Sequence, residues 1–434
     1  MMRLDRRSFL KSSLAAGAAT ALPALASGPA QAQQTVRLRA TWWGSQDRAH
    51  RTLAVAELFT KSHPGISIIG EPVGGDAYWP KLATQMAGRN IPDVFQLEPN
   101  TLPDYSGRGA CLDLTKFLPK PLDIEGFGQR MVDLGRVYDN LYGVALGLNS
   151  FSMFYDTAMF EKAGLPAPTP DTTWDDYARL VTELNKAVGR PGEYWASPDG
   201  SRYHYVFQVW LGQRGKTTFS EDGGIGFTVD DIKEFYTYWQ GLREKKVIVP
   251  ADVASVDDNS IQNNCLALGK SAIGFTYSNQ LVGYQLLIKN KLGIAMVPQA
   301  GKGAPSGHFY RPALIWSIGA SCKNPEAAAE FISFFVNDIE AGKILGVERG
   351  VPMSPKVREA ILPNLNPTEQ ATVAYVNMLE DRVMDYPPPA PIGANEYDRN
   401  VFRPVADQLA YGKLTVAEAA EKLVEDAKAV LRKR

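Results

Sequence analysis

Aromatic and polar side chains occur at the ends of several strands that the sequence predicts. They are Trp42, Trp43, Glu98, Asn100, Tyr277, Ser278 and Asn279. Aromatic rings pack against flat C–H faces, while carboxylates, amides and hydroxyls form hydrogen bonds with a rim of hydroxyl groups. Side chains that follow parallel strands meet at one edge of a sheet, where ligand clefts form. These residues therefore favour the binding of a small polyhydroxylated ligand in a cleft.

Some of these residues also have structural explanations, which the sequence leaves open. Of Trp42 and Trp43, we expect one to pack in the core and the other, Trp43, to face the ligand. Glu98 and Asn100 would equally suit a solvated loop. Trp210 lies in an aromatic segment with helical spacing, which is more typical of a core than of a binding site.

Three arginines, Arg48, Arg311 and Arg349, lie in segments expected to border such a cleft. Each taken singly fits a surface charge or a charge between two lobes. Together they favour an anionic ligand, because the guanidinium fork matches a carboxylate. We expect Arg48 and Arg311 to face each other across the cleft. The alternative is that both pair with acidic residues such as Glu98 or Asp76 and orient them toward ligand hydroxyls.

Sequence patterns typical of catalysis or metal binding are absent. The four histidines lack the spacing of metal ligands, and there is no Cys-x-x-Cys pair. The run Gly269-Lys270-Ser271 imitates the end of a phosphate-binding loop, but Asn264 stands where that loop needs its first glycine. No Gly-x-Ser-x-Gly elbow occurs. We therefore expect no enzymatic activity, no cofactor and no bound metal.

The elements that must position these residues begin with an alternating pattern. The sequence predicts strands at about 36–40, 66–71 and 93–97, with helices at about 50–62 and 78–87 between them. This order is typical of a parallel sheet with helices on both faces. Later strand-like runs and helices are predicted at 141–146, 151–155, 271–275, 292–297, 313–320, 325–336 and 416–432.

The N-terminal segment has the pattern of an export signal. Arg6-Arg7 precede an apolar run at 14–26, and Ala30-Gln31-Ala32 offers a cleavage site. The paired arginines resemble a twin-arginine signal, which predicts a signal peptide at 1–32 and a periplasmic location. A chance arginine pair before a membrane anchor is the alternative, but the run is short and rich in alanine and glycine. No cysteine lies near the cleavage site, so we expect no lipid anchor there.

Composition limits the remaining classes of protein. The 434 residues suffice for two lobes with cores of their own, and a net charge of −1 does not favour nucleic acid or an anionic membrane as a partner. Cys111, Cys265 and Cys322 are widely spaced. We expect buried free thiols, although one disulfide would be compatible with an oxidising compartment.

Five motifs in order carry a resemblance to a known family. They are Trp42-Trp43-Gly44, Ile91-Pro92-Asp93-Val94, the block from Leu141 to Asp176, the run from Leu268 to Ile273 and the segment from Lys323 to Phe335. In this order the chain resembles family 1 extracellular solute-binding proteins of carbohydrate ABC importers, similar to maltodextrin- and oligogalacturonide-binding proteins. Two departures are small, since Asp156 replaces the family's Asn and Asp176 its Glu.

The resemblance implies the two-lobed α/β fold of periplasmic binding proteins of type II, with the ligand in the cleft between the lobes. Carried onto this chain, lobe one covers 36–148 plus 313–345, and lobe two covers 149–312 plus 346–434. It also implies that Asn149, on the first hinge strand, contacts the ligand, and that Asn279 stands where many relatives have a stacking Trp. The expected ligand-binding residues are Trp43, Arg48, Glu98, Asn100, Asn149, Tyr277, Ser278, Asn279, Tyr310, Arg311 and Arg349.

The function that the resemblance implies is the capture of a sugar or oligosaccharide, including an acidic one such as a uronate oligosaccharide, and its delivery to permease subunits in the inner membrane. We expect a monomer. An exported polysaccharide-processing enzyme remains an alternative, although paired carboxylates such as Asp257 and Asp258 are too common to indicate glycoside hydrolysis. A second alternative is a protein that binds an amino acid, a polyamine or a metal.

Overall fold

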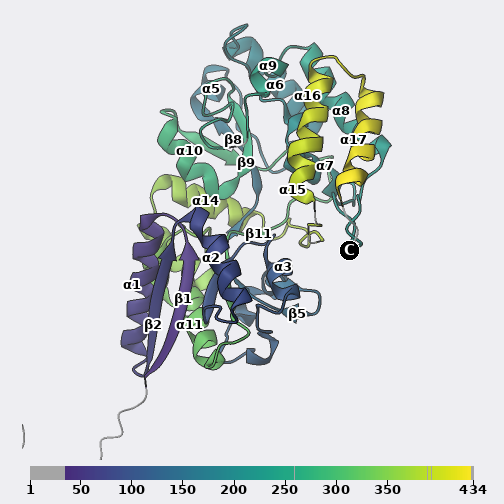
Figure 1. The fold of residues 1–434 in the computed structure, drawn as a ribbon. Coiled ribbons are helices and arrows are strands. Elements are labelled where there is room, and N and C mark those ends of the chain that lie inside the picture. Colours follow the sequence, from purple (N-terminus) through teal and green to yellow (C-terminus); the bar gives the residue numbers. More distant parts are fainter. Residues whose placement is uncertain (1–34, 259, 389, 392, 432–434) are drawn as a thin grey trace, which may run out of the picture. The chain divides into compact units, whose positions relative to one another are not determined.

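The computed structural model describes residues 35–431 apart from 259, 389 and 392. The signal peptide expected at 1–32 lies outside the described residues. Residues Thr35–Arg434 form one compact unit by themselves. Two larger sheets, each with its own helices, form most of this unit (Figure 1). We call the five-stranded sheet with its helices lobe one, and the three-stranded sheet with its helices lobe two.

The sheet of lobe one has the strand order β2-β1-β3-β12-β6. Its parallel part consists of β1 (Val36–Trp43), β2 (Ile66–Val73) and β3 (Val94–Leu97). The strand β12 (Ile315–Ile318) returns antiparallel to β3, and β6 (Val144–Ala145) pairs antiparallel with β12. The expected parallel sheet is therefore present, and two strands from later in the chain extend it at one edge.

Helices cover both faces of this sheet because its strands alternate between two apolar faces. One face packs against α1 (Gln46–Ser62) and α11 (Pro325–Asn337), and the other against α2 (Gly75–Ala87). The helix α12 (Ile339–Leu345) packs on α1. Ser45 caps α1, since its side chain accepts a hydrogen bond from the backbone N–H of Arg48 at 3.1 Å.

The sheet of lobe two is antiparallel, with the strand order β10-β8-β9. The central strand β8 (Phe151–Asp156) pairs with β9 (Ile273–Tyr277) and with β10 (Leu292–Ala295). Phe151 lies opposite Tyr277 in this register. The central strand β8 is buried along most of its length.

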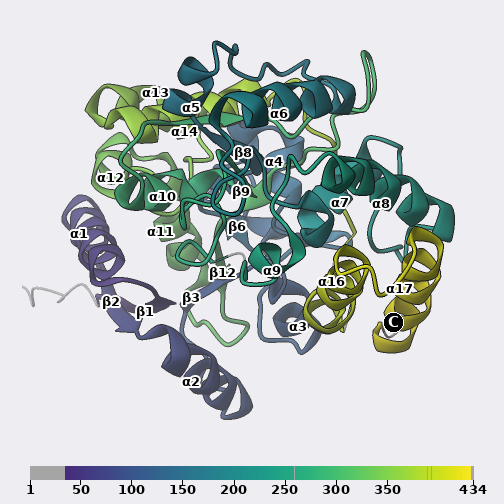
Figure 2. The same cartoon turned by 90° about the horizontal axis from the view of Figure 1, so that it is seen from above.

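Five longer helices surround the apolar core of lobe two: α6 (Trp174–Val188), α7 (His204–Gly212), α8 (Val229–Glu244), α16 (Arg403–Ala410) and α17 (Val416–Val430). Figure 2 shows α7, α8, α16 and α17 gathered on one side of the strands. Capping boxes begin α6, α8 and α17, with threonine as the first residue of each box. The core is rich in tryptophan and tyrosine rings that contact one another edge to face.

Two short strands join the lobes. The strand β7 (Leu148–Asn149) pairs antiparallel with β11 (Arg311–Pro312), so that Asn149 lies opposite Arg311. Leu148 also forms a bridge with Val351, which brings a third chain segment to the same place. A small cluster of buried side chains, including Leu148, Tyr310 and Val351, packs around these crossings.

The remaining elements are shorter than these helices, apart from the 12-residue helix α14. They are α3 (Leu102–Gly107), α4 (Gln129–Asp133), α5 (Thr157–Lys162), α9 (Ala251–Ala254), α10 (Leu281–Leu287), α13 (Pro355–Ile361), α14 (Pro367–Met378), α15 (Ala394–Glu396), β4 (Arg136–Val137), β5 (Asn140–Leu141), the 3₁₀ turns η1 (Thr115–Phe117), η2 (Glu125–Phe127), η3 (Gly200–Arg202), η4 (Ser278–Gln280) and η5 (Leu362–Asn364), and the π-helix η6 (Tyr397–Phe402).

The three cysteines are free thiols, as expected from the sequence. Cys111 and Cys265 are buried, and Cys322 is partly buried. Burial raises the pKa of the Cys111 thiol to about 12, which keeps it protonated and unreactive. Among the described residues, no helix is both long enough and apolar enough to cross a bilayer.

A buried histidine holds the segment that leads to Arg311. His308 is almost fully enclosed; its Nε2 accepts a hydrogen bond from the Val297 N–H at 3.2 Å, and its Nδ1 lies 3.0 Å from the Ser306 carbonyl oxygen. Burial lowers the pKa of His308 from 6.5 to about 4. The neutral ring is therefore part of the folded structure.

This histidine predicts an acid-sensitive stability. Between pH 6.5 and 4 the unfolded chain takes up a proton at His308 that the folded chain does not, so the free energy of unfolding falls as pH falls through this window. The expected loss is about 3 kcal/mol, and it is complete only below pH 4. Urea unfolding at several pH values should show it, and His308→Gln should flatten the profile. An unchanged profile in that variant would contradict the assignment.

Candidate functional site

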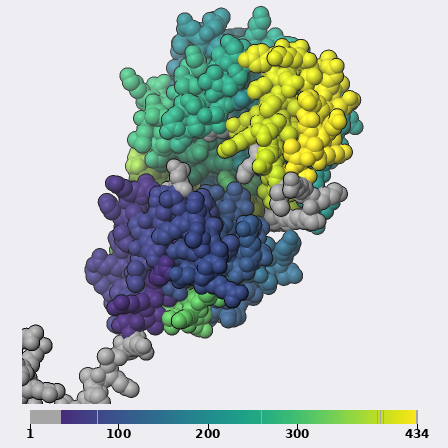
Figure 3. Space-filling model, in the orientation of Figure 1, coloured from purple at the N-terminus to yellow at the C-terminus, as the bar shows by residue number. Residues whose placement is uncertain are grey.

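A cavity of about 330 Å³ lies between the two lobes. Lobe one contributes the loop after β3 and the region of β4, and lobe two contributes α7, the end of β9, the segment before β11 and the segment from 386 to 403. In Figure 3 the purple and blue surface of lobe one adjoins the teal and yellow surface of lobe two. Such a place between lobes is common for ligand sites. We call this cavity the cleft pocket.

Aromatic rings form one wall of the cleft pocket. Tyr277, at the end of β9, packs against Tyr205 of α7 with ring centroids 5.0 Å apart. Phe309 packs against Tyr386 at 5.7 Å, and Phe219 completes the aromatic lining. Rings in such positions offer flat apolar faces together with phenolic hydroxyls, the combination that suits a sugar ring.

Arg311 lies against this wall. Its guanidinium carbon is 5.0 Å from the centroid of the Tyr277 ring, and β11 holds its backbone beside Asn149. Within the described chain, no carboxylate comes within ion-pair distance (4.0 Å) of Arg311, and its side chain lines the cleft pocket. The guanidinium therefore presents donors to the pocket that no protein carboxylate engages.

The charge of Arg311 is secure despite its enclosure. Burial by itself lowers the pKa of Arg311, but Tyr277, Tyr205, Tyr386 and Glu98 raise it by more, so the net shift is upward. Glu98 and Arg311 also act on each other through their charges. Burial raises the pKa of the Glu98 carboxyl, and the charge of Arg311 partly opposes that shift. A charged guanidinium at the end of an aromatic wall is suited to a carboxylate on a sugar.

A polar network lies beside the aromatic wall, since His204 contacts Tyr205 with ring centroids 3.8 Å apart. His204 Nδ1 lies 2.8 Å from Asp398 Oδ1, and Arg403 Nη2 donates to Asp398 Oδ2 at 2.5 Å. Although burial raises the pKa of Asp398, its hydrogen bonds and charge interactions with His204 and Arg403 lower it to about 2. Asp398 is therefore ionised near neutral pH, with both oxygens occupied by protein partners.

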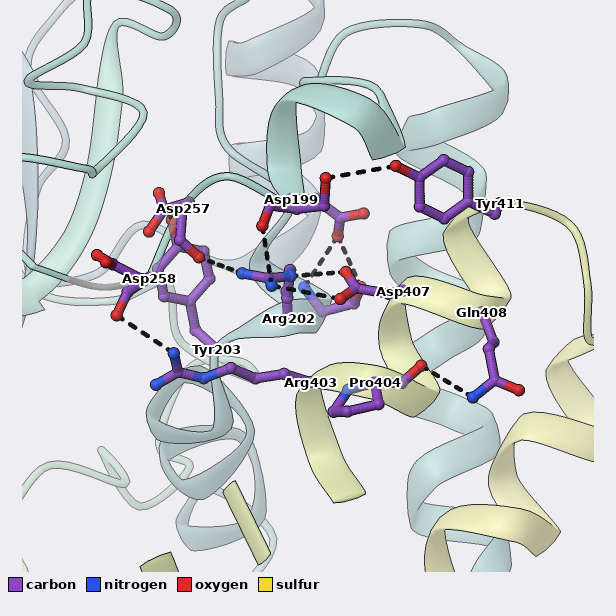
Figure 4. A network of polar contacts seen from close by, with 12 residues as sticks. Asp199, Arg202, Tyr203, Asp257, Asp258, Arg403, Pro404, Asp407, Gln408 and Tyr411 are labelled. Carbon is purple, nitrogen blue, oxygen red and sulfur yellow. Dashed lines mark hydrogen bonds and ion pairs between the residues drawn. The ribbon is translucent and has the colours of Figure 1, made fainter. Parts of the chain in front are cut away.

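The same network ties η6 and α16 to the core of lobe two. Arg403 Nη1 donates to the Asp258 carbonyl oxygen at 3.2 Å, as Figure 4 shows. Arg202 Nε donates to Asp407 Oδ1 at 2.6 Å, and Tyr203 Oη donates to Asp257 Oδ2 at 2.5 Å. These contacts hold the segment that forms the outer wall of the pocket in a fixed position.

The lining of the cleft pocket is electropositive. It contains Arg136, Arg311, Arg399 and Arg403, against Asp398 as the one carboxylate among the described lining residues. Arg136 and Arg403 are already in ion pairs, so Arg311 and Arg399 supply the unpaired charge. This imbalance favours an anionic ligand over a neutral one.

The structure brings three of the expected ligand-binding residues together in the cleft pocket. Asn100, Tyr277 and Arg311 all line it. Two more lie next to these three. Glu98 acts on Arg311 electrostatically, and Asn149 is the strand partner of Arg311 with a buried side-chain oxygen that has no hydrogen-bond partner in the described chain.

Three other expected residues, Trp43, Arg48 and Arg349, form a separate cluster near the end of β1. Trp43 packs against Tyr78 and Trp79 with centroids 4.8 and 5.0 Å apart, while Trp42 is fully buried. Arg48 Nε donates to Glu348 at 2.7 Å and Arg48 Nη1 to the Trp43 carbonyl oxygen at 3.1 Å. Arg48 therefore pairs with the chain segment just after α12, which leads to the third crossing, and does not line the cleft pocket.

Arg349 belongs to this second cluster. It is 3% exposed and donates to the Thr52 hydroxyl at 2.8 Å and to the Gln96 side chain. Burial, reinforced by the nearby charge of Arg48, lowers the pKa of Arg349 to about 9. Its contacts hold the third crossing segment against α1 and β3, outside the lining of the cleft pocket.

The last three expected residues lie around the crossings and also outside that lining. Ser278 is buried, and its hydroxyl accepts a hydrogen bond from the Ser150 N–H at 3.2 Å. Asn279 is exposed in the 3₁₀ turn η4, just before α10. Tyr310 is in the core, and its hydroxyl donates to the Val376 carbonyl oxygen at 2.7 Å.

Several residues that line the cleft pocket were not predicted from the sequence. They are Arg136, His204, Tyr205, Gln208, Thr218, Phe219, Phe309, Tyr386, Asp398, Arg399 and Arg403. The aromatic segment of α7 gave a signal for Tyr205, because it lies in the same helix as the buried Phe207 and Trp210 but is itself only partly buried. The segment from 386 to 403 gave none, because it has no hydrophobic period.

A larger cavity, of about 650 Å³, lies within lobe two where α6 and α8 end. Two of its cations, Arg190 and Arg243, are engaged in ion pairs. Lys245 and Lys246 follow the C-terminal end of α8, where positive charge stabilises the helix dipole. Structural roles therefore account for its charges, and the cleft pocket is the better candidate for the ligand.

Comparisons with known proteins agree with the two-lobed fold. The family model of bacterial extracellular solute-binding proteins matches residues 44–341, and that of twin-arginine signal sequences matches residues 3–23. An extracellular solute-binding protein of family 1 from Alicyclobacillus acidocaldarius is 29% identical, with a TM-score of 0.80 over 91% of this chain and 98% of that one.

Two further relatives are named for the sugars that they bind. A periplasmic oligogalacturonide-binding protein from Yersinia enterocolitica is 26% identical, with a TM-score of 0.77 over 91% of this chain and 98% of that one. The arabinooligosaccharide-binding protein of Bacillus subtilis is 23% identical over 60% of this chain. That match spans 59% of the relative's own length.

Proposed function

Because the chain belongs to the family of bacterial extracellular solute-binding proteins, we propose that it captures a sugar in the cleft pocket and delivers it to the permease of an ABC importer. It carries a twin-arginine signal and is exported to the periplasm. The observation that carries the proposal is an interlobe pocket lined by aromatic rings and by an arginine with no carboxylate partner. The permease subunits lie in the inner membrane.

The two lobes move about the crossing segments in this proposal. Lobe one comprises 36–148 plus 313–345, and lobe two comprises 149–312 plus 346–434. Three short segments, including β7 and β11, connect them, and each absorbs part of a backbone rotation. The ligand favours the closed form because only there does it contact both walls of the pocket. The protein acts as a monomer.

The sugar is acidic in the finer form of the proposal. Arg311 and the electropositive lining support this, and so does the similarity to the Yersinia relative, which is an oligogalacturonide-binding protein. The argument rests on Arg311 together with Arg399 rather than on a pair of Arg48 and Arg311, because Arg48 is held by Glu348. A neutral arabinooligosaccharide, named for the Bacillus relative, is the competing ligand.

The protein binds its sugar without converting it. The pocket supports this because Asp398, the one acidic side chain among its described lining residues, is engaged by His204 and Arg403. The described lining therefore offers no pair of free carboxylates to the ligand. Incubating pure protein with digalacturonic acid and analysing the sugar by mass spectrometry tests this. Turnover of the sugar would make the protein an enzyme instead of a receptor.

The expected result of a ligand screen is stabilisation by one class of sugar. Galacturonic acid, digalacturonic acid, mannobiose and arabinobiose are tested by thermal shift and calorimetry. A sugar at a hundred times its dissociation constant adds about 2.7 kcal/mol to the free energy of unfolding. Small-angle scattering should show a smaller radius with that sugar. If amino acids or polyamines stabilised the protein and none of the sugars did, the proposal would be contradicted.

A further inference from the structure

The cleft pocket has a second polar end that the ligand-binding residues discussed so far do not explain. It lies where α7, the loop at 218–219 and η6 meet, and its polar lining includes Gln208, Thr218 and Arg399. Arg311 and Tyr277 form the other end, at the hinge. A chain of ring contacts separates the ends, since Tyr277 contacts Tyr205 at 5.0 Å and Tyr205 contacts His204 at 3.8 Å.

Thr218 is an unpaired polar group at this second end. It is 1% exposed, and its Oγ1 has no hydrogen-bond partner within the described chain. A buried hydroxyl without a partner destabilises the folded state, and such groups are rare in native proteins. Because Thr218 lines the pocket, a ligand hydroxyl is the partner that the fold leaves room for.

Two further side chains at this end are also free of protein partners. Gln208 lies one turn after His204 on α7 and forms no side-chain hydrogen bond with a described residue. Arg399 is exposed on η6 and forms no ion pair within the described chain, whereas Arg403 and His204 beside it are both bound to Asp398. A π-helix is uncommon and frequently lies at functional sites.

We infer that this end is a second sugar subsite, which holds the next residue of an acidic oligosaccharide whose first residue lies at Arg311. Thr218 and Gln208 bind hydroxyls of the second residue, Phe219 packs against its ring, and Arg399 binds its carboxylate. Asp398 does not contact the sugar, because its two oxygens hold His204 and Arg403 and thereby fix η6. The inference rests on the proposed function, since it extends the same pocket from one sugar residue to two.

The test compares galacturonic acid with digalacturonic acid by calorimetry. The unmutated protein should bind the disaccharide at least tenfold more tightly, because only the disaccharide reaches both ends. Thr218→Val and Arg399→Ala should each weaken the disaccharide by about tenfold and leave the monosaccharide within about twofold. Thr182→Val and Arg179→Ala on α6, outside the pocket, serve as matched controls.

A stability measurement guards against misfolding of the variants. Thr218→Val replaces an unpaired hydroxyl with a methyl group of similar shape, so it should raise the melting temperature of the ligand-free protein while it lowers affinity. A threonine with a purely structural role would lower both.

Equal weakening of both sugars by the two variants, or no weakening of either, would overturn the subsite while the proposed function stands. Failure of the unmutated protein to bind either uronate would overturn the subsite together with the acidic ligand. Binding of mannobiose or arabinobiose in that same experiment would leave the general sugar receptor in place.

Discussion

Arg311→Ala is expected to weaken the binding of digalacturonic acid by about ten- to a hundredfold, while any neutral sugar that binds changes by less than about threefold. A hydrogen bond to a charged partner contributes about 1.5–3 kcal/mol, which corresponds to that range of affinity. The effect should be selective because Arg311 has no carboxylate partner among the described residues, and a ligand carboxylate takes that place. Calorimetry with digalacturonic acid and mannobiose measures both arms.

A conservative variant separates charge from geometry. Arg311→Lys keeps the positive charge but loses the fork that binds both oxygens of a carboxylate, so it should recover only part of the affinity. Arg190→Ala removes an arginine of lobe two that lines the other cavity and should change nothing. If Arg311→Ala weakened acidic and neutral sugars equally, Arg311 would serve the hinge rather than the charge of the ligand.

The sequence predicted lobe one more fully than lobe two, for a physical reason. The strands at 36–43, 66–73 and 94–97 alternate with helices whose apolar spacing is clear, so their order already indicated a parallel sheet. The sheet of lobe two combines β8 with β9 and β10, which lie more than a hundred residues further along the chain. Their antiparallel pairing depends on long-range packing that local patterns do not contain.

The expected residues that reach the candidate site include two that lie at the end or the start of a strand. Tyr277 ends β9 and Arg311 begins β11, and both reach the cleft pocket. Tyr205 was hidden within an aromatic segment whose other members, Phe207 and Trp210, are buried. Asp398 is positioned by His204, which is 194 residues away. No spacing rule within a single sequence reveals such a contact.

The arginines show why a charge cannot be assigned a role from its type alone. Arg48, Arg311 and Arg349 were equivalent candidates in the sequence. In the structure, Arg48 pairs with Glu348 and Arg349 is enclosed against Thr52, while Arg311 keeps its donors toward the pocket. The partner decides the role, because a paired guanidinium stabilises the fold and an unpaired one is available to a ligand.

The largest decrease in the free energy of unfolding is expected from removing an ion pair next to the N-terminal end of α7, between Arg243 of α8 and Asp199 just before η3. Arg243 Nε donates to Asp199 Oδ2 at 2.7 Å, and the side chains are 11% and 2% exposed. Asp199 also accepts hydrogen bonds from the Ser201 backbone N–H and hydroxyl, which fixes η3 just before α7 and its pocket residue Tyr205. Arg243→Met leaves the carboxylate buried without its counter-charge, so the free energy of unfolding should fall by about 3–5 kcal/mol.

Urea unfolding of single and double variants tests this pair. Adding Asp199→Asn to Arg243→Met removes the uncompensated charge, so the double variant should regain much of the loss, and the shortfall from additivity measures the coupling. Arg190→Met, whose ion pair with Glu193 is exposed, should cost less than about 1 kcal/mol. A similarly small loss for Arg243→Met would mean that water reaches Asp199 in solution, because a hydrated carboxylate does not need the buried partner. In that case the position of α7, and with it the aromatic wall, would depend on the apolar core around Trp239 rather than on this ion pair.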